Sequence, residues 1–332
     1  MKISGSAVFA VVVLASFAGG CTSGGTRATA TPKTPAPTTT VSASPGELAL
    51  VAEAGRPGDP DLDKRSRLSE IKELLPSPGG GLIVVSHKDD RIFSEVTATG
   101  QVKSFLLQHG ATFPDGTVFA GAMTALLNPD GSALVVNDAG VLARVTAAGH
   151  ATNLGTIPKG DGTGSPHLLK GKAGVPILEL GGFAYRVSIL GERASFSKMS
   201  IKRPPAGFDY SILSPDGNDS YADNGKDRVV RLNAAGKVAS TYHVQANGGI
   251  ASLSPGAGNS AWVGMTDGSV FHLSVDGRTE MVARGGVTCS HAFNPSPSSG
   301  SIADADVLLV IATQVYISDP GCRRIVALGV AE

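Results

Sequence analysis

The chain has 332 residues, enough for one large domain or two average ones, and it contains 43 glycines, 42% hydrophobic residues and 17% charged residues. This composition suits many short strands joined by glycine-rich turns better than long solvated helices. The 28 basic and 28 acidic side chains cancel and form no long basic run, so we expect the folded body to bind neither nucleic acid nor anionic lipid.

The first 20 residues predict a secretory signal peptide. Lys2 supplies the positive start, and the apolar stretch from Ala7 to Ala18 is too short to span a bilayer as a helix. Small residues then lead into Cys21, and Ala18-Gly19-Gly20-Cys21 resembles the bacterial lipobox, with Ala18 at the place where Leu is usual. We therefore expect lipidation of Cys21. The alternative is an ordinary signal peptide that is cut after small residues.

Residues 21–45 predict a stalk that follows the lipid anchor. The stretch from Thr22 to Pro45 consists almost entirely of Thr, Ala, Pro, Ser and Gly, which cannot bury enough apolar surface to offset the entropy of ordering. As a flexible chain it would span roughly 25–30 Å. We expect secretion across the cytoplasmic membrane, attachment to its outer face through the lipid alone, and a folded domain over residues 46–332.

The folded domain shows a repeat in the glycines that close its alternating strands. Their intervals are 49, 42, 45 and 41 residues, measured between Gly100, Gly149, Gly191, Gly236 and Gly277. A period of 40 to 50 residues with several short strands in each unit predicts the blades of a β-propeller.

The last repeat shows how the ring is expected to close. Asp319 to Leu328 matches Asp223 to Leu232, but the chain ends at Glu332, before an outer strand can follow. Leu48 to Gly55 is an apolar strand with no inner strands before it. The sequence therefore predicts an all-β, six-bladed propeller whose N-terminal strand completes the last blade and removes an exposed edge. A rival alignment of Gln314–Gly321 with Gly268–Gly277 completes that blade without the N-terminal strand.

Two of the repeats resemble the NHL-repeat family. The relevant stretches are Tyr221 to Val229 (YADNGKDRV) and Tyr316 to Ile325 (YISDPGCRRI), with a weaker copy from Val85 to Ile92. The resemblance implies a six-bladed propeller that binds protein, glycan or nucleic acid, and related propellers include lactonases and lyases. We interpret the repeated Asp and Arg as a hydrogen-bonded pair that fixes the corner between two strands, which is a structural role.

The residues that could carry chemistry are scattered. No two of the seven histidines have the i, i+2 or i, i+4 spacing of a local metal site. Only His87 and His291 are candidates for the channel, and the favoured interpretation is that the histidines lie in turns or on the surface. Carboxylate and amide side chains also occur at comparable blade corners, namely Asn137, Asp138, Asp223 and Asp319. They could chelate a cation only if those corners faced the channel. The sequence therefore predicts no catalytic residue, no metal site and no cofactor.

The remaining signals concern Trp262 and the two C-terminal cysteines. Trp262 lies on an inner-strand pattern that favours core packing, and aromatic residues make up only 5% of the chain, which weighs against glycan binding. If Cys21 carries lipid, Cys289 and Cys322 remain as an even pair. We expect them to form a disulfide across the last blade, the alternative being two buried free thiols.

Together these patterns favour a tethered, monomeric, non-catalytic binding or sensor module that presents a propeller face to a protein or a small ligand. The alternative is a metal-dependent lactonase or lyase with its site in the central channel. Three or more Asp, Asn, Glu or His side chains converging on one point in the channel would favour the enzyme.

Overall fold

The computed structural model describes residues 42–331 except 55–67, 69, 78–79, 88–92, 105–110, 147, 160–164, 172–173, 181–182, 200–203, 209, 214–218, 287–288 and 290–292. The chain divides into two units, Met1–Pro37 and Thr38–Glu332, and the described residues all belong to the second. The predicted signal peptide, the lipidation site Cys21, most of the stalk and His291 lie outside the described residues. In the described part, no helix is long and apolar enough to cross a membrane.

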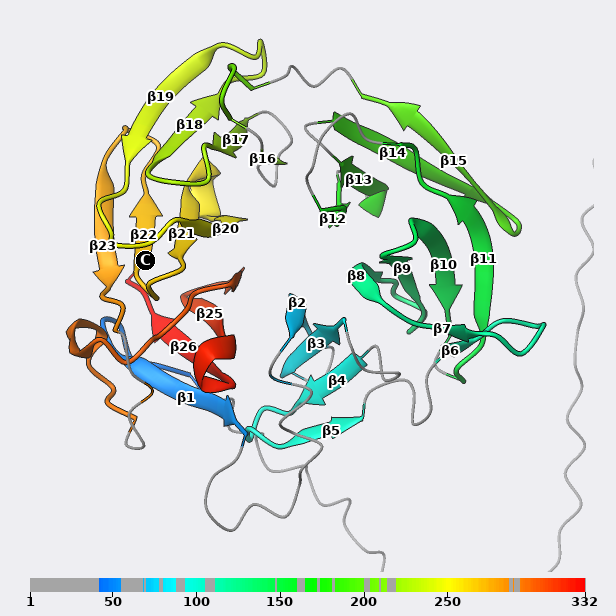
Figure 1. The fold of residues 1–332 in the computed structure, drawn as a ribbon, viewed down its shortest axis with the longest axis horizontal. Helices are drawn as coiled ribbons and strands as arrows, with labels where there is room; N and C mark the ends of the chain where they lie inside the picture. The colour runs from blue at the N-terminus through cyan, green and yellow to red at the C-terminus, as the bar shows by residue number, and fades with distance from the viewer. Residues whose placement is uncertain are drawn as a thin grey trace, which may run out of the picture. The chain divides into compact units, whose positions relative to one another are not determined.

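The described residues form six four-stranded antiparallel sheets, the blades, which are arranged around a central axis (Figure 1). The first three blades, each named from its inner strand outward, are β2 (Ile71–Pro76), β3 (Leu82–Ser86), β4 (Phe93–Val96) and β5 (Val102–Ser104); β8 (Ala122–Leu127), β9 (Ala133–Asn137), β10 (Val141–Val145) and β11 (Ala151–Thr156); and β12 (His167–Lys170), β13 (Pro176–Leu180), β14 (Phe183–Leu190) and β15 (Arg193–Lys198).

The other three blades are β16 (Tyr210–Leu213), β17 (Ser220–Asp223), β18 (Arg228–Leu232) and β19 (Val238–His243); β20 (Ile250–Pro255), β21 (Ala261–Met265), β22 (Val270–Leu273) and β23 (Thr279–Ala283); and β24 (Val307–Ile311), β25 (Gln314–Asp319), β26 (Arg324–Gly329) and β1 (Leu48–Glu53). A small hairpin of β6 (Ala111–Thr112) and β7 (Val118–Phe119) lies between the first two blades in the chain, and short 3-10 turns are η2 (Ala257–Asn259), η3 (Pro297–Ser299) and η4 (Pro320–Cys322).

The predicted turn glycines lie between the third and fourth strands of the first five blades. All of them have left-handed backbones, with φ values of 78°, 84°, 60°, 72° and 93° at Gly100, Gly149, Gly191, Gly236 and Gly277. A side chain is strained in this conformation, so glycine is the residue that lets each strand reverse direction tightly. The sequence period therefore marks the blades correctly.

The ring closes as predicted. β1 pairs antiparallel with β26, from Leu48 opposite Leu328 to Glu53 opposite Arg324, so the last sheet has the order β1-β26-β25-β24. The rival alignment is wrong, because β25 and β26 are the second and third strands of this blade and the outer strand comes from the other end of the chain. Just before β1, Ala43 exchanges hydrogen bonds of 2.9 and 3.0 Å with the Gln314 side chain.

Apolar side chains fill the spaces between neighbouring blades. At the closing seam, β1 contributes Leu48, Val51 and Ala52 to two of these buried clusters, so it is an integral part of the core. Among the described residues the smallest cluster is that of blade four, where Ala222, Val230 and Leu232 pack with Phe208. Burial of apolar surface on both sides of β1 explains why a strand far away in the sequence completes the ring.

Candidate functional site

The inner strands of the six blades surround a cavity on the axis of the ring. Strands β2, β8, β12, β16, β20 and β24 each have a hydrogen-bonded neighbour on one side only, so the edge nearer the axis is unpaired within the sheet (Figure 1). Residues of all six inner strands line one cavity of about 670 Å³. This volume lies in the range of small-molecule binding sites.

The described wall of the cavity is mainly aliphatic. Leucine, isoleucine, valine, methionine and proline side chains from the inner strands supply most of it, and none of the described lining residues is Phe, Tyr or Trp. Trp262 lies instead in β21, where it is buried and stacked on His272 with 4.6 Å between ring centroids, as the strand pattern predicts. The described wall therefore offers no Phe, Tyr or Trp ring on which a sugar could stack.

One side of the cavity carries a hydrogen-bonded chain that crosses three blades. Glu73 Oε2, on β2, accepts from the Ala125 amide at 2.6 Å and from Thr124 Oγ1 at 2.9 Å, both on β8. Thr124 Oγ1 in turn accepts from the Leu168 amide of β12 at 2.8 Å. Side chains therefore accept hydrogen bonds from the Ala125 and Leu168 amides on the unpaired edges of the inner strands. An amide buried without such a partner would be costly.

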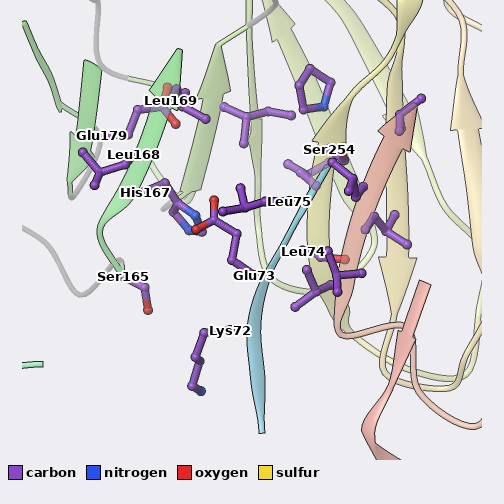
Figure 2. A pocket seen from close by; sticks show the side chains of 18 of the residues that line it. Lys72, Glu73, Leu74, Leu75, Ser165, His167, Leu168, Leu169, Glu179 and Ser254 are labelled. Carbon is purple, nitrogen blue, oxygen red and sulfur yellow. The ribbon is translucent and has the colours of Figure 1, made fainter. Parts of the chain in front are cut away.

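His167 and Glu179 lie on the same side of the cavity. His167 begins β12 and pairs across the sheet with Glu179 of β13, and both line the cavity together with Glu73. Figure 2 shows the side chains of Glu73 and His167 pointing into the same part of the cavity, while Lys72 extends away from them.

Burial shifts the pKa values of Glu73 and His167 in opposite directions. It raises the pKa of Glu73 to about 8, although the hydrogen bonds from Ala125 and Thr124 act to lower it. It lowers the pKa of His167 to about 4. At neutral pH the Glu73 carboxyl therefore keeps its proton and the His167 imidazole has none, so both groups are uncharged and able to exchange hydrogen bonds with a ligand.

We expect Glu73→Gln to stabilise the protein increasingly as the pH rises. The folded pKa of about 8 lies above the ordinary value of 4.5, so between these pH values the unfolded chain releases a proton that the folded protein retains. Stability is thus lost as the pH rises through this window. Glutamine keeps an acceptor for Ala125 and Thr124 but cannot ionise. Melting temperatures from pH 5 to pH 8.5 should show a gap that widens with pH. The matched control is Glu280→Gln on exposed β23. A gap between Glu73→Gln and the wild type that stays constant with pH would contradict the raised pKa of Glu73.

The corner residues do not gather in the channel. Asn137 Oδ1 accepts from the Val141 amide at 2.9 Å within its own turn, and Asp138 packs against Gly121. Asp223 lines the cavity and accepts from the Gly225 amide at 2.7 Å, whereas Asp319 is buried in an ion pair with Arg324. Across the described parts of the chain, no three His, Cys, Asp or Glu side chains are placed to hold a metal ion.

The predicted Asp–Arg corner pair is present in the last blade. Arg324 Nε lies 3.0 Å from Asp319 Oδ2, and the two side chains are only 1% and 0% exposed. In blade four the equivalent Arg228 is 50% exposed, and its ion pair is with Asp227 at 4.0 Å. The motif thus forms a buried pair in the last blade, where the preceding segment with Ser301 and Ala303 contacts it, and a half-exposed pair in blade four.

The predicted disulfide is also present. Cys289 and Cys322 are bonded with 5.3 Å between their Cα atoms, and the bond joins the segment before β24 to the turn between β25 and β26. Cysteines bonded in this way are typical of proteins that fold in an oxidising compartment.

His87, one of the two histidines considered for the channel, follows β3 and is not among the described residues that line the cavity. The histidine at the cavity is His167, and neither Glu73 nor Glu179 was anticipated. The available signal was a single acid within each of two apolar runs, IKELLP and PILEL. An acid within the apolar run of a buried strand needs a polar environment, which in a propeller the channel can provide.

No protein-family model and no curated protein matches the chain. Among solved structures it is similar to a Bacteroides thetaiotaomicron protein of unknown function, with TM-score 0.58 and 10% identity over 85% of this chain and 75% of that one. It is also similar to streptogramin B lyase, with TM-score 0.46 and 12% identity over 78% of each chain. A third is an extracellular domain from Bacteroides thetaiotaomicron, of a protein classed as a one component system, with TM-score 0.48 and 13% identity over 87% of this chain and 37% of that one.

At these identities the similarity concerns the fold alone. The chain is an all-β protein with a six-bladed propeller fold, and residues of all six blades line its central cavity.

Proposed function

We propose that the protein is a membrane-tethered, extracytoplasmic binding or sensor module of the NHL-repeat type, and that its ligand site is the central cavity of the propeller. The observation that carries this proposal is the cavity of about 670 Å³, which has aliphatic walls and a few convergent polar groups. Pockets of this size and composition are typical of sites that bury a small molecule and orient it with a few hydrogen bonds.

Two independent features support the proposed extracytoplasmic location of the protein. The N-terminal sequence has the pattern of a signal peptide followed by Cys21, the proposed lipid attachment site, and a stalk rich in Thr and Pro. The bond between Cys289 and Cys322 fits folding outside the reducing cytoplasm. In this arrangement the lipid holds the protein at the membrane surface and the propeller remains free to bind a solute.

A channel-filling substitution tests the ligand site. Ala251 lies on inner strand β20 and lines the cavity, so Ala251→Trp would occupy space that a ligand needs. We expect mass spectrometry of denatured, membrane-isolated protein to detect a released small molecule in the wild type, with a loss of at least about tenfold in the variant. The matched control is Ala234→Trp in an exposed turn, which should release the same amount as the wild type. Equal release from both variants would contradict a channel site.

A further inference from the structure

The proposed function leaves the ligand unnamed, and the wall of the cavity narrows its chemistry. The apolar lining is built from aliphatic side chains of the inner strands, such as Leu75, Leu169, Ile250 and Leu309. Aliphatic walls favour an aliphatic ligand because burial of apolar surface is the dominant gain and the described lining has no Phe, Tyr or Trp ring for stacking. The body of the ligand should therefore be a chain or a compact aliphatic skeleton.

The Glu73 carboxyl has one oxygen committed to the protein and one facing the cavity. Oε2 accepts both protein hydrogen bonds, from Ala125 N and Thr124 Oγ1. For Oε1 the described residues provide no hydrogen-bond partner, while Glu73 lines the cavity. Because Oε2 is occupied as an acceptor, the proton of the acid is best placed on Oε1, from which it can be donated to a ligand.

The charges around Glu73 are unfavourable to an anion. The charged or titratable groups that line the cavity are Lys72 on β2, His167 and Lys170 on β12, Glu179 on β13, Asp223 on β17 and Asp306 just before β24, while β8 contributes none. Both lysines are exposed, and burial raises the pKa of Asp306 while Lys72 opposes it. Besides Glu73 and His167, the described lining thus has three acids and two lysines, which gives an anion no net attraction.

From this geometry, and resting on the proposed function of the cavity as a ligand site, we propose that the channel binds an uncharged, mainly aliphatic molecule that carries an acceptor oxygen, such as an ester, ketone or alcohol. The aliphatic walls hold its body, and Glu73 Oε1 donates a hydrogen bond to the oxygen. His167 lies on the same side of the cavity and limits where the polar end of the ligand can lie. The site is distinguished from a fatty-acid site by its preference for the neutral ester over the carboxylate.

The test uses the mature chain with Cys21→Ser, which removes the lipid attachment atom and avoids detergent. The probe is the neutral dye N-phenyl-1-naphthylamine, whose fluorescence rises in an apolar site, with methyl octanoate and octanoate as competitors at pH 7. We expect methyl octanoate to displace the dye at a concentration at least about tenfold lower than octanoate does. Equal or stronger displacement by octanoate would overturn the proposed ligand class.

The pH dependence tests the role of Glu73. One unit above a pKa of about 8, roughly a tenth of the protein retains the proton, so the wild-type affinity for methyl octanoate should be about tenfold lower at pH 9 than at pH 7. Glu73→Gln keeps an N–H donor at both pH values and should show no such loss, whereas Glu73→Leu should bind weakly at both. Glu280→Gln, an identical substitution on exposed β23, should behave as the wild type. A wild-type affinity that does not change with pH would overturn the assignment of Glu73 as donor.

Dye binding to Ala251→Trp separates this inference from the proposed function. If the filled channel binds the dye as well as the wild type does, while its melting curve is unchanged, the dye site is not the channel and the proposed function is contradicted. If Ala251→Trp abolishes dye binding but the ester has no advantage over the carboxylate, the channel remains the ligand site and only the ligand class is wrong.

Discussion

Arg324→Met should lower the free energy of unfolding by about 3–5 kcal/mol, the cost of breaking a buried ion pair by removing one partner. Arg324 is fully buried; its Nε donates to Asp319 Oδ2 at 3.0 Å and its Nη2 donates to the Ser301 carbonyl. Without the guanidinium, the Asp319 carboxylate would remain in the core with only backbone amides as partners. Denaturant unfolding of the oxidised protein at pH 7 measures the loss.

A second substitution separates the buried charge from the lost packing. Asp319 also accepts from the Ala303, Asp304 and Cys322 amides, at 3.3, 3.2 and 3.3 Å, so Asn at this position keeps an acceptor and removes the charge. Arg324→Met/Asp319→Asn should therefore be more stable than Arg324→Met alone. The matched control is Arg228→Met at the equivalent, exposed corner of blade four, which should change stability by no more than about 0.5 kcal/mol. If Arg324→Met and Arg228→Met lower the free energy of unfolding equally, burial of the ion pair does not govern its contribution to stability.

The contrast between these two arginines shows where sequence reasoning about the fold succeeds. The turns at positions such as Gly236 and Gly277 have a left-handed backbone that glycine adopts without strain. The spacing of these glycines along the sequence therefore marks the blades directly. The match of Asp319–Leu328 with Asp223–Leu232 placed β25 and β26 correctly and left an outer position for β1. The burial of Arg324 could not be read in this way, because the segment that covers it lies outside the repeat.

The cavity was less accessible to sequence reasoning than the ring. Its wall combines residues from all six inner strands, together with Glu179 of β13 and Asp223 of β17, which are far apart in the chain, so no local spacing marks it. Glu73 and His167 are close only because β2 and β12 both flank β8, which the hydrogen bonds through Thr124 demonstrate. Corner residues such as Asp319 are visible in the repeat, yet their role is structural, whereas the channel residues that could meet a ligand have no motif.

Replacing both Cys289 and Cys322 with Ala should lower the free energy of unfolding by about 3–4 kcal/mol, because the unfolded chain would no longer be restrained by a loop of 33 residues. The bond also restrains the segment that secures the ring closure, in which the Pro295 carbonyl accepts from the Leu48 amide of β1 at 2.6 Å. Hydrogen exchange should therefore accelerate in β1 and β26 more than in β9 and β10. Denaturant unfolding gives the total change, and reduced wild type should match the variant. A loss that is equal in all blades would contradict a local role at the closure.

The disulfide and the buried ion pair should prove to be coupled. Cys322 lies three residues from Asp319 and donates its amide to that carboxylate, and Arg324 bonds Ser301, which lies inside the loop that the disulfide closes. Both interactions therefore hold the same segment against β25 and β26. Once either is lost, the segment loosens and the other has less structure left to stabilise, so combining Arg324→Met with removal of the cysteines should cost less than the sum of the separate losses. Strict additivity in the double-mutant cycle would show that the two restrain the ring independently.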